Sequence, residues 1–99
     1  MIYFFDDYEN FSAENFLKFL PKNRHEKFNR LKRKIDRENC VVAYLLLRFA
    51  LKENGIEDFE IVVGENGKPF LKSGEMFFNI SHCAEGVAVA LDTASVGID

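Results

Sequence analysis

The sequence contains no tryptophan, only two cysteines and two prolines, and no long uninterrupted hydrophobic run. Cys40 and Cys83 lie far apart and lack the CxxC or CxxH spacing of zinc sites, which argues against a zinc-stabilised domain and a disulfide scaffold. Two isolated thiols fit a reducing compartment, so we predict a cytoplasmic protein. No stretch approaches the roughly 20 apolar residues that span a bilayer, and the N-terminal residues lack the basic start of a signal peptide.

Length and hydrophobic content predict one folded domain covering residues 1–99. The chain is 47% hydrophobic and contains eleven phenylalanines, which is enough for a compact core and excludes a disordered protein. A domain of this size buries a smaller fraction of its surface on folding than a larger domain does. We therefore expect that part of its surface packs against another subunit or domain.

Charge is divided unevenly along the chain. The segment Lys22–Arg37 holds two acidic residues and eight basic ones, namely Lys22, Arg24, Lys27, Arg30, Lys32, Arg33, Lys34 and Arg37. Its net charge is +6 within a chain of net charge −3, so the remainder carries −9. Such a segment is either a solvated helix face or an anion-binding surface, and its excess of positive charge favours a partner elsewhere.

The order of patterns predicts an α+β fold, with a mostly antiparallel sheet and helices packed on one face. Strands are expected at 2–5, 59–63 and within 77–98, with a short extended piece at 68–71, and helices at 12–20, 23–34 and 36–54. The continuous apolar run of the first strand suggests burial on both of its faces. Asp36 is the expected N-cap of the long helix, and Ser12 that of the first helix, with Phe11 and Phe16 in the positions of a hydrophobic staple.

The stretch from Phe77 to Asp99 predicts an antiparallel meander whose polar residues could form a site. A Ser81-His82 pair stands where the first strand of the meander ends, and Gly97-x-Asp99 lies in its last strand. Because these strands are neighbours in one meander, the two groups could converge. His82 also has a structural interpretation, as a turn residue that hydrogen-bonds backbone, and Lys68-Pro69 could be turn chemistry alone.

Three motifs in a fixed order resemble the N-terminal half of the Sfp-type 4′-phosphopantetheinyl transferases. They are Gly67-Lys68-Pro69, then Phe78-Asn79-Ile80-Ser81-His82, and finally Val96-Gly97-Ile98-Asp99. The preceding basic helix and long helix are also similar to those of the family. The resemblance implies one half of a pseudo-dimeric fold, and transfer of phosphopantetheine from coenzyme A to a serine of an acyl or peptidyl carrier protein.

The resemblance also implies which residues meet the ligands. These are Arg24 and Lys27 at the 3′-phosphate of coenzyme A, Lys68 and Pro69 at its adenine nucleotide, Ser81 and His82 at its phosphates, and Asp99 at Mg²⁺. The chemistry suits these roles, since cationic side chains bind phosphates and Mg²⁺ prefers carboxylate and phosphate oxygens. No catalytic residue is assigned.

The sequence departs from the family pattern at two points. Asn39 stands where many relatives have a basic residue early in the long helix. The tryptophan-containing second half, which resembles the first and usually supplies the general base and further metal ligands, has no counterpart here. A single copy of this chain is therefore expected to form half of a site.

Three interpretations stay open at the level of sequence. The chain could be the N-terminal half of a transferase, or a homodimer in which two copies rebuild the two-half architecture. It could also be a non-catalytic module whose basic helix binds an acidic carrier protein or a nucleotide. Net acidity, and the lack of aromatic residues among the basic ones, count against nucleic acid as the partner.

Overall fold

A computed structural model describes residues 1–83 and 85–93 of the chain. The elements in this part are β1 (Ile2–Phe5), the 3₁₀ helix η1 (Ala13–Phe19), α1 (Lys22–Arg30), α2 (Lys34–Glu53), β2 (Ile61–Val63), β3 (Pro69–Leu71), β4 (Phe77–Cys83) and β5 (Gly86–Asp92). The final strand predicted around residues 96–98 lies outside the described residues. Across the described ranges, no helix is both long and apolar enough to cross a membrane.

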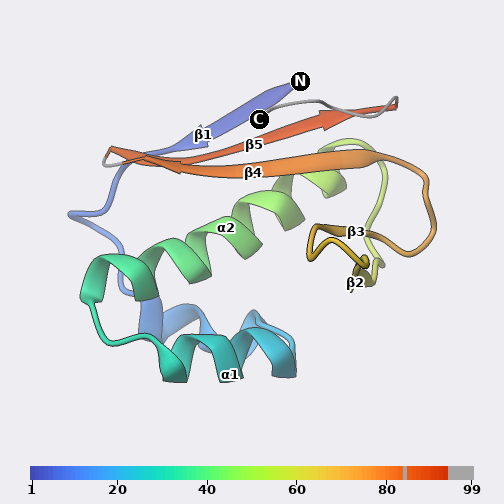
Figure 1. The fold of residues 1–99 in the computed structure, drawn as a ribbon. Coiled ribbons are helices and arrows are strands. Elements are labelled where there is room, and N and C mark those ends of the chain that lie inside the picture. The colour runs from blue at the N-terminus through green and yellow to red at the C-terminus, as the bar shows by residue number, and fades with distance from the viewer. Residues whose placement is uncertain (84, 94–99) are drawn as a thin grey trace.

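The strands form two antiparallel sheets. β5 is the central strand of a three-stranded sheet in the order β1-β5-β4, and β2 pairs with β3 in a separate hairpin. Figure 1 shows α2 beneath the three-stranded sheet and α1 beneath α2, so both helices lie on one side of the sheet. This arrangement confirms the predicted α+β fold with antiparallel strands.

The helix α2 provides the largest part of the core. Val41, Leu47 and Leu51 are completely buried on it, and Val87 and Val89 of β5 are completely buried opposite. Removing one such side chain from water contributes about 1.5–3 kcal/mol to folding. The apolar character of residues 41–51, apart from Arg48, therefore reflects contacts with the sheet on one side and with η1 and α1 on another.

The first predicted helix forms, but as a 3₁₀ helix. Its staple is present, because the rings of Phe11 and Phe16 stack with centroids 5.3 Å apart. Ser12 occupies the N-cap position without a side-chain hydrogen bond. The Leu20 amide bonds the Leu17 carbonyl three residues earlier, which is the 3₁₀ pattern, so the segment ends as a tight turn immediately before Pro21.

The prediction that the first strand is buried on both faces is wrong. Tyr3 and Phe5 pack toward the core, whereas Ile2 and Phe4 are 75% and 51% exposed. Among the residues that the structure describes, β1 is an edge strand, and the helices cover only one face of its sheet. The strand is held to β5 from its first residue, since the Met1 amino group donates to the Leu91 carbonyl at 2.9 Å.

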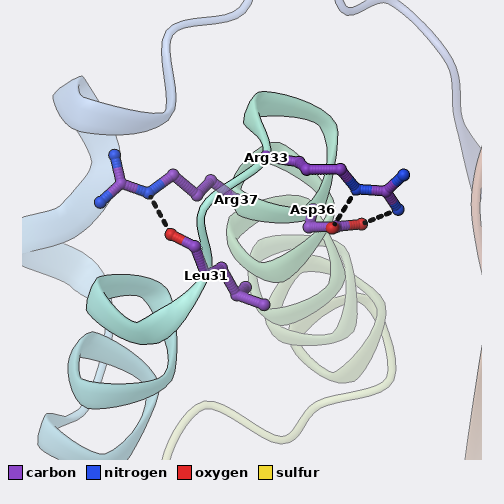
Figure 2. A network of polar contacts seen from close by, with 4 residues as sticks. All are labelled: Leu31, Arg33, Asp36 and Arg37. Atoms are coloured by element: carbon purple, nitrogen blue, oxygen red, sulfur yellow. Dashed lines mark hydrogen bonds and ion pairs between the residues drawn. The ribbon is translucent and has the colours of Figure 1, made fainter.

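The boundary between the two basic helices also differs from expectation. α1 ends at Arg30, and α2 begins at Lys34 with Arg33, not Asp36, at the N-cap position. The Asp36 carboxylate binds the Arg33 guanidinium at 2.8 Å instead of capping the helix. On the opposite side of α2, Arg37 donates through Nε to the Leu31 carbonyl at 3.0 Å, which closes the turn between the helices (Figure 2).

Gly86 is the position where the sheet tolerates no side chain. A Cβ built there would lie 2.2 Å from the Phe5 carbonyl oxygen and 2.9 Å from the Phe4 ring. We expect Gly86→Ala to lower the free energy of unfolding by more than about 2 kcal/mol, because β1 must move away from β5. Urea denaturation measures this change. Ser81→Ala in the same hairpin is the control and should change stability by less than about 0.5 kcal/mol; equal effects of both variants would contradict the close packing.

Candidate functional site

His82 lies at the corner where the end of β4 meets the basic helices. It alternates with Phe78 and Ile80, whose side chains pack into the core beneath the sheet, so the imidazole is on the helix-facing side. Solvent reaches the ring. The charges of Lys27 and Arg24 on α1 and of Asp36 on α2 act on it. The fold therefore brings together three predicted site residues that are up to 58 positions apart in sequence.

Two influences lower the pKa of His82 below its ordinary value. Partial removal of the ring from water is the larger cause, followed by the positive charges of Lys27 and Arg24, while Asp36 acts in the opposite direction. Both causes disfavour the protonated imidazole. At neutral pH the site therefore contains two cations beside a neutral ring, and a bound anion would shift this balance toward protonation.

The two cations are available for an external partner. Arg24 is half-buried, and its Nη1 donates weakly to the Cys40 carbonyl at 3.5 Å and to Cys40 Sγ at 3.9 Å. Lys27 is exposed. In the part of the chain that the structure describes, neither residue forms an ion pair with a carboxylate. A pair of unneutralised cations next to a neutral imidazole is suited to a phosphate group.

Tyr8 and Asn39 form a polar contact behind this corner. The Tyr8 hydroxyl donates to Asn39 Oδ1 at 2.6 Å. Burial raises the pKa of Tyr8, and the nearby charges of Glu38, Cys83 and Asp6 raise it further. Asn39 therefore accepts a hydrogen bond that joins α2 to the segment after β1. The sequence pattern did not indicate this contact, nor that Asp36 would raise the pKa of His82.

Ser81 does not accompany His82. Adjacent residues of a strand point to opposite faces, and Ser81 pairs in register with Ala88 whereas His82 pairs with the buried Val87. The exposed Ser81 side chain therefore belongs to the outer face of the sheet. A ligand at the helix side could meet His82 by its side chain and Ser81 only by its backbone.

Lys68 and Pro69 lie at the other end of the sheet. They line a hollow of about 210 Å³ between the β2–β3 turn and the start of β4, together with Gly64, Asn66, Phe70, Phe77 and Phe78. The Lys68 amide donates to Asn66 Oδ1 at 3.1 Å, which fixes the turn. Phe77 and His82 are five strand positions apart, or roughly 16 Å at the rise of a strand. A ligand touching both groups would have to extend along β4.

Asp99, the predicted Mg²⁺ ligand, lies outside the described residues. Within residues 1–83 and 85–93, no group of three histidine, cysteine or acidic side chains is arranged to hold a metal ion. The described residues thus contain the basic corner at His82 and the hollow at Lys68 but no metal centre of their own.

Comparison with known proteins agrees with the motif resemblance. No family model matches the chain. The chain is 34% identical over 80 residues to a 4′-phosphopantetheinyl transferase from Bacillus subtilis. The similarity covers 77% of this chain and 36% of that protein, so the chain spans about a third of its relative's length. The comparison supports a relationship with this family.

The lowered pKa of His82 gives a direct prediction. The imidazole should titrate below 6.5, the ordinary value for histidine, in NMR spectra recorded against pH. Because the folded state disfavours the protonated ring, the stability that this group contributes is complete above about pH 6.5 and is lost as pH falls toward the folded pKa. Lys27→Ala should raise the pKa toward 6.5, and the control Lys22→Ala on the same helix should not. An unchanged value in Lys27→Ala would refute the electrostatic contact.

Proposed function

We propose that this chain is the coenzyme A-binding N-terminal half of a 4′-phosphopantetheinyl transferase. The observation that carries the proposal is the gathering of Arg24, Lys27 and His82 at one corner, with both cations lacking acidic partners in the described ranges. The similarity to the Bacillus subtilis transferase supports the same family. Basic side chains without partners favour a polyanionic ligand, and coenzyme A is one.

In this proposal each group of residues holds a different part of coenzyme A. Arg24 and Lys27 bind the 3′-phosphate, and His82 with the Ser81 backbone meets the other phosphates. Lys68 and Pro69 contact the adenine nucleotide. The apolar wall of the Lys68 hollow, to which Phe70 and Phe77 contribute, supports a site for an aromatic base.

The proposed reaction transfers phosphopantetheine from coenzyme A to a serine of a carrier protein: the serine oxygen forms a bond to the phosphorus atom attached to the pantetheine arm, and the bond from this phosphorus to 3′,5′-ADP breaks, so that 3′,5′-ADP is released. Phosphoryl transfer depends mainly on positioning and on neutralisation of charge, and the basic corner supplies both to the phosphates. Mg²⁺ is assigned to Asp99, with its remaining ligands from the phosphates and from a second half. Bound there, it would neutralise charge on the pyrophosphate.

The outer face of the sheet is the proposed surface for the partner that completes the site. Ile2 and Phe4 of β1 and Phe77 of β4 lie on this face and are between 42% and 75% exposed. Exposed apolar side chains grouped on one sheet face favour an interaction surface. Either a C-terminal half or a second copy of the chain would cover it.

The second candidate function is a non-catalytic module. The segment Lys22–Arg37 has a high positive charge, and most of its basic residues are exposed. This charge favours a binding module, and the argument does not depend on the hollow at Lys68. This surface would bind an acidic carrier protein or a nucleotide by charge alone. Such binding would weaken strongly with salt and would not require Lys68 or Pro69.

The assignment of the 3′-phosphate can be tested with a pair of ligands. Calorimetry should show that Lys27→Ala weakens binding of coenzyme A by about tenfold or more, the value of one charge-assisted hydrogen bond. Binding of 3′-dephospho-coenzyme A, which lacks the phosphate in question, should be unaffected by the same substitution. Lys22→Ala is the matched control. Equal losses of affinity for both ligands would mean that Lys27 contacts a part of coenzyme A other than the 3′-phosphate. If the unaltered chain does not bind coenzyme A, the proposed function is refuted.

Activity is tested by intact mass. The chain is mixed with an apo carrier protein, coenzyme A and Mg²⁺ over a range of chain concentrations. If two copies form a complete site, the carrier protein gains one phosphopantetheine group at a rate that rises steeply with chain concentration, and Asp99→Ala and His82→Ala abolish the gain. If coenzyme A binds but no mass is gained at any concentration, the chain is a half-enzyme that needs its partner.

A further inference from the structure

The chain contains the sequence Glu-Asn-Gly twice, at residues 53–55 where α2 ends and at residues 65–67 in the turn between β2 and β3. An asparagine followed by glycine is prone to lose its side-chain amide, because glycine has no side chain to hinder attack of its backbone nitrogen on the asparagine. Since the three residues are identical at the two sites, a large difference in their reactivity has to come from the fold.

The backbones of the two sites are alike. Gly55 and Gly67 have φ angles of +84° and +82°, and a Cβ built on either would meet no atom within 4 Å. The Gly55 amide donates to the Lys52 carbonyl at 3.0 Å. The Gly67 amide donates to the Gly64 carbonyl at 2.9 Å. The two attacking nitrogens are therefore similarly open and similarly restrained, and the sites differ in their asparagine side chains.

The side chain of Asn54 is held in place. It is half-buried, and its Nδ2 donates to the Ala50 carbonyl at 2.8 Å and to the Tyr3 hydroxyl at 3.3 Å. The nitrogen that would have to leave is thus bonded to α2 and to β1 at once. Rotation of the side chain toward the Gly55 nitrogen breaks both hydrogen bonds, which slows the reaction by about tenfold or more.

The side chain of Asn66 is exposed and is already turned toward the following peptide. Among the hydrogen bonds of residues 1–83 and 85–93, its Oδ1 accepts one from the Lys68 amide at 3.1 Å, and its Nδ2 donates none. The bond to Oδ1 folds the side chain back over the Gly67 peptide. It also polarises the carbonyl group that the Gly67 nitrogen would attack. The fold therefore leaves the departing nitrogen free at Asn66 and bonded at Asn54.

We propose that Asn66 deamidates spontaneously in the folded protein, whereas the two hydrogen bonds of Asn54 protect it. The Gly67 nitrogen forms a bond to Asn66 Cγ, and the bond from Cγ to Nδ2 breaks. Nδ2 leaves as ammonia, taking the proton of the Gly67 amide, and a succinimide ring results. Water, the co-reactant, then opens this ring at either carbonyl and gives aspartate or isoaspartate at position 66.

The reaction is measured by incubating the folded chain at mildly alkaline pH and locating each reacted asparagine by tandem mass spectrometry. Exchange of the side-chain NH₂ for OH should be at least about tenfold faster at Asn66 than at Asn54. The product should separate chromatographically into aspartate and isoaspartate forms. In urea, which unfolds the chain, the two rates should agree within about twofold. No reaction at Asn66, equal rates in the folded chain, or an undiminished ratio in urea would overturn the proposal.

Tyr3→Phe tests the protection of Asn54. It removes one of the two acceptors of Asn54 Nδ2 and keeps the aromatic ring, so the rate at Asn54 should rise by about threefold or more while the rate at Asn66 stays the same. Tyr44→Phe makes the same exchange away from these hydrogen bonds and should change neither rate. Circular dichroism confirms that both variants are folded. An unchanged rate at Asn54 in Tyr3→Phe would contradict the protective role of the hydrogen bonds.

Deamidation also alters the hollow at Lys68, which Asn66 lines. It adds a negative charge there, and this charge disfavours an anion. The effect on coenzyme A rests on the proposed function, which assigns the adenine nucleotide to this hollow. Calorimetry should show that Asn66→Asp weakens coenzyme A binding by about threefold or more, whereas Asn15→Asp, which adds the same charge on η1, should change it by less than about twofold.

The two experiments fail separately. Unchanged coenzyme A affinity in Asn66→Asp would contradict the effect on the hollow. If the unaltered chain does not bind coenzyme A, the proposed function fails, and the incubation experiment still decides whether Asn66 deamidates.

Discussion

The burial of α2 between the three-stranded sheet and the two preceding helical segments is the interaction on which the rest of the structure depends. Its residues contact β5 on one side and η1 and α1 on another. In the described part of the chain the sheet has three strands, one of them the four-residue β1, and its inner face becomes a core by packing against this helix. Arg24, Lys27 and His82 lie on α1 and β4, and both of these elements pack against α2.

This central position of α2 also explains how one basic segment serves two surfaces. Asp36 and Arg37 are consecutive, yet they point to opposite sides of the helix (Figure 2). The charge from Lys22 to Arg37 is consequently divided between the corner at His82 and the opposite side of α2, where Arg37 lies. Because Arg33 is paired with Asp36, the segment is less uniform than its net charge suggests. Local neutralisation occurs at the first turn of α2, and much of the remaining charge faces outward.

Much of the fold could be predicted from the sequence, because its signals are local. Strict alternation identified β4 and β5, and the long apolar stretch with Asn54-Gly55 at its end identified α2. The exposure of Ile2 and Phe4 could not be predicted, since it depends on which sheet face the helices cover. The start of α2 was also predicted wrongly. The Asp36 carboxylate binds the Arg33 guanidinium instead of capping the helix, and capping preferences alone do not predict which of these two partners the carboxylate takes.

The candidate site was predictable to a smaller extent. The motifs indicated Arg24, Lys27 and His82, and the fold places these three together. Alternation along β4 already implied that Ser81 and His82 point apart, although their adjacency in one motif suggested a common role.

The position of β5 in the middle of its sheet has a consequence for synthesis of the chain. β1 is the first strand to leave the ribosome, but its partner residues are Val87 to Ala90. During translation the apolar β1 therefore has no strand to pair with until nearly all of the described chain has emerged. The backbone hydrogen bonds of the α2 helix, by contrast, are local, so this helix can form early. The aromatic segment Tyr3 to Phe5 is thus unpaired during most of the elongation of the described residues, and an unpaired apolar strand of this kind is prone to aggregate before its partner is made.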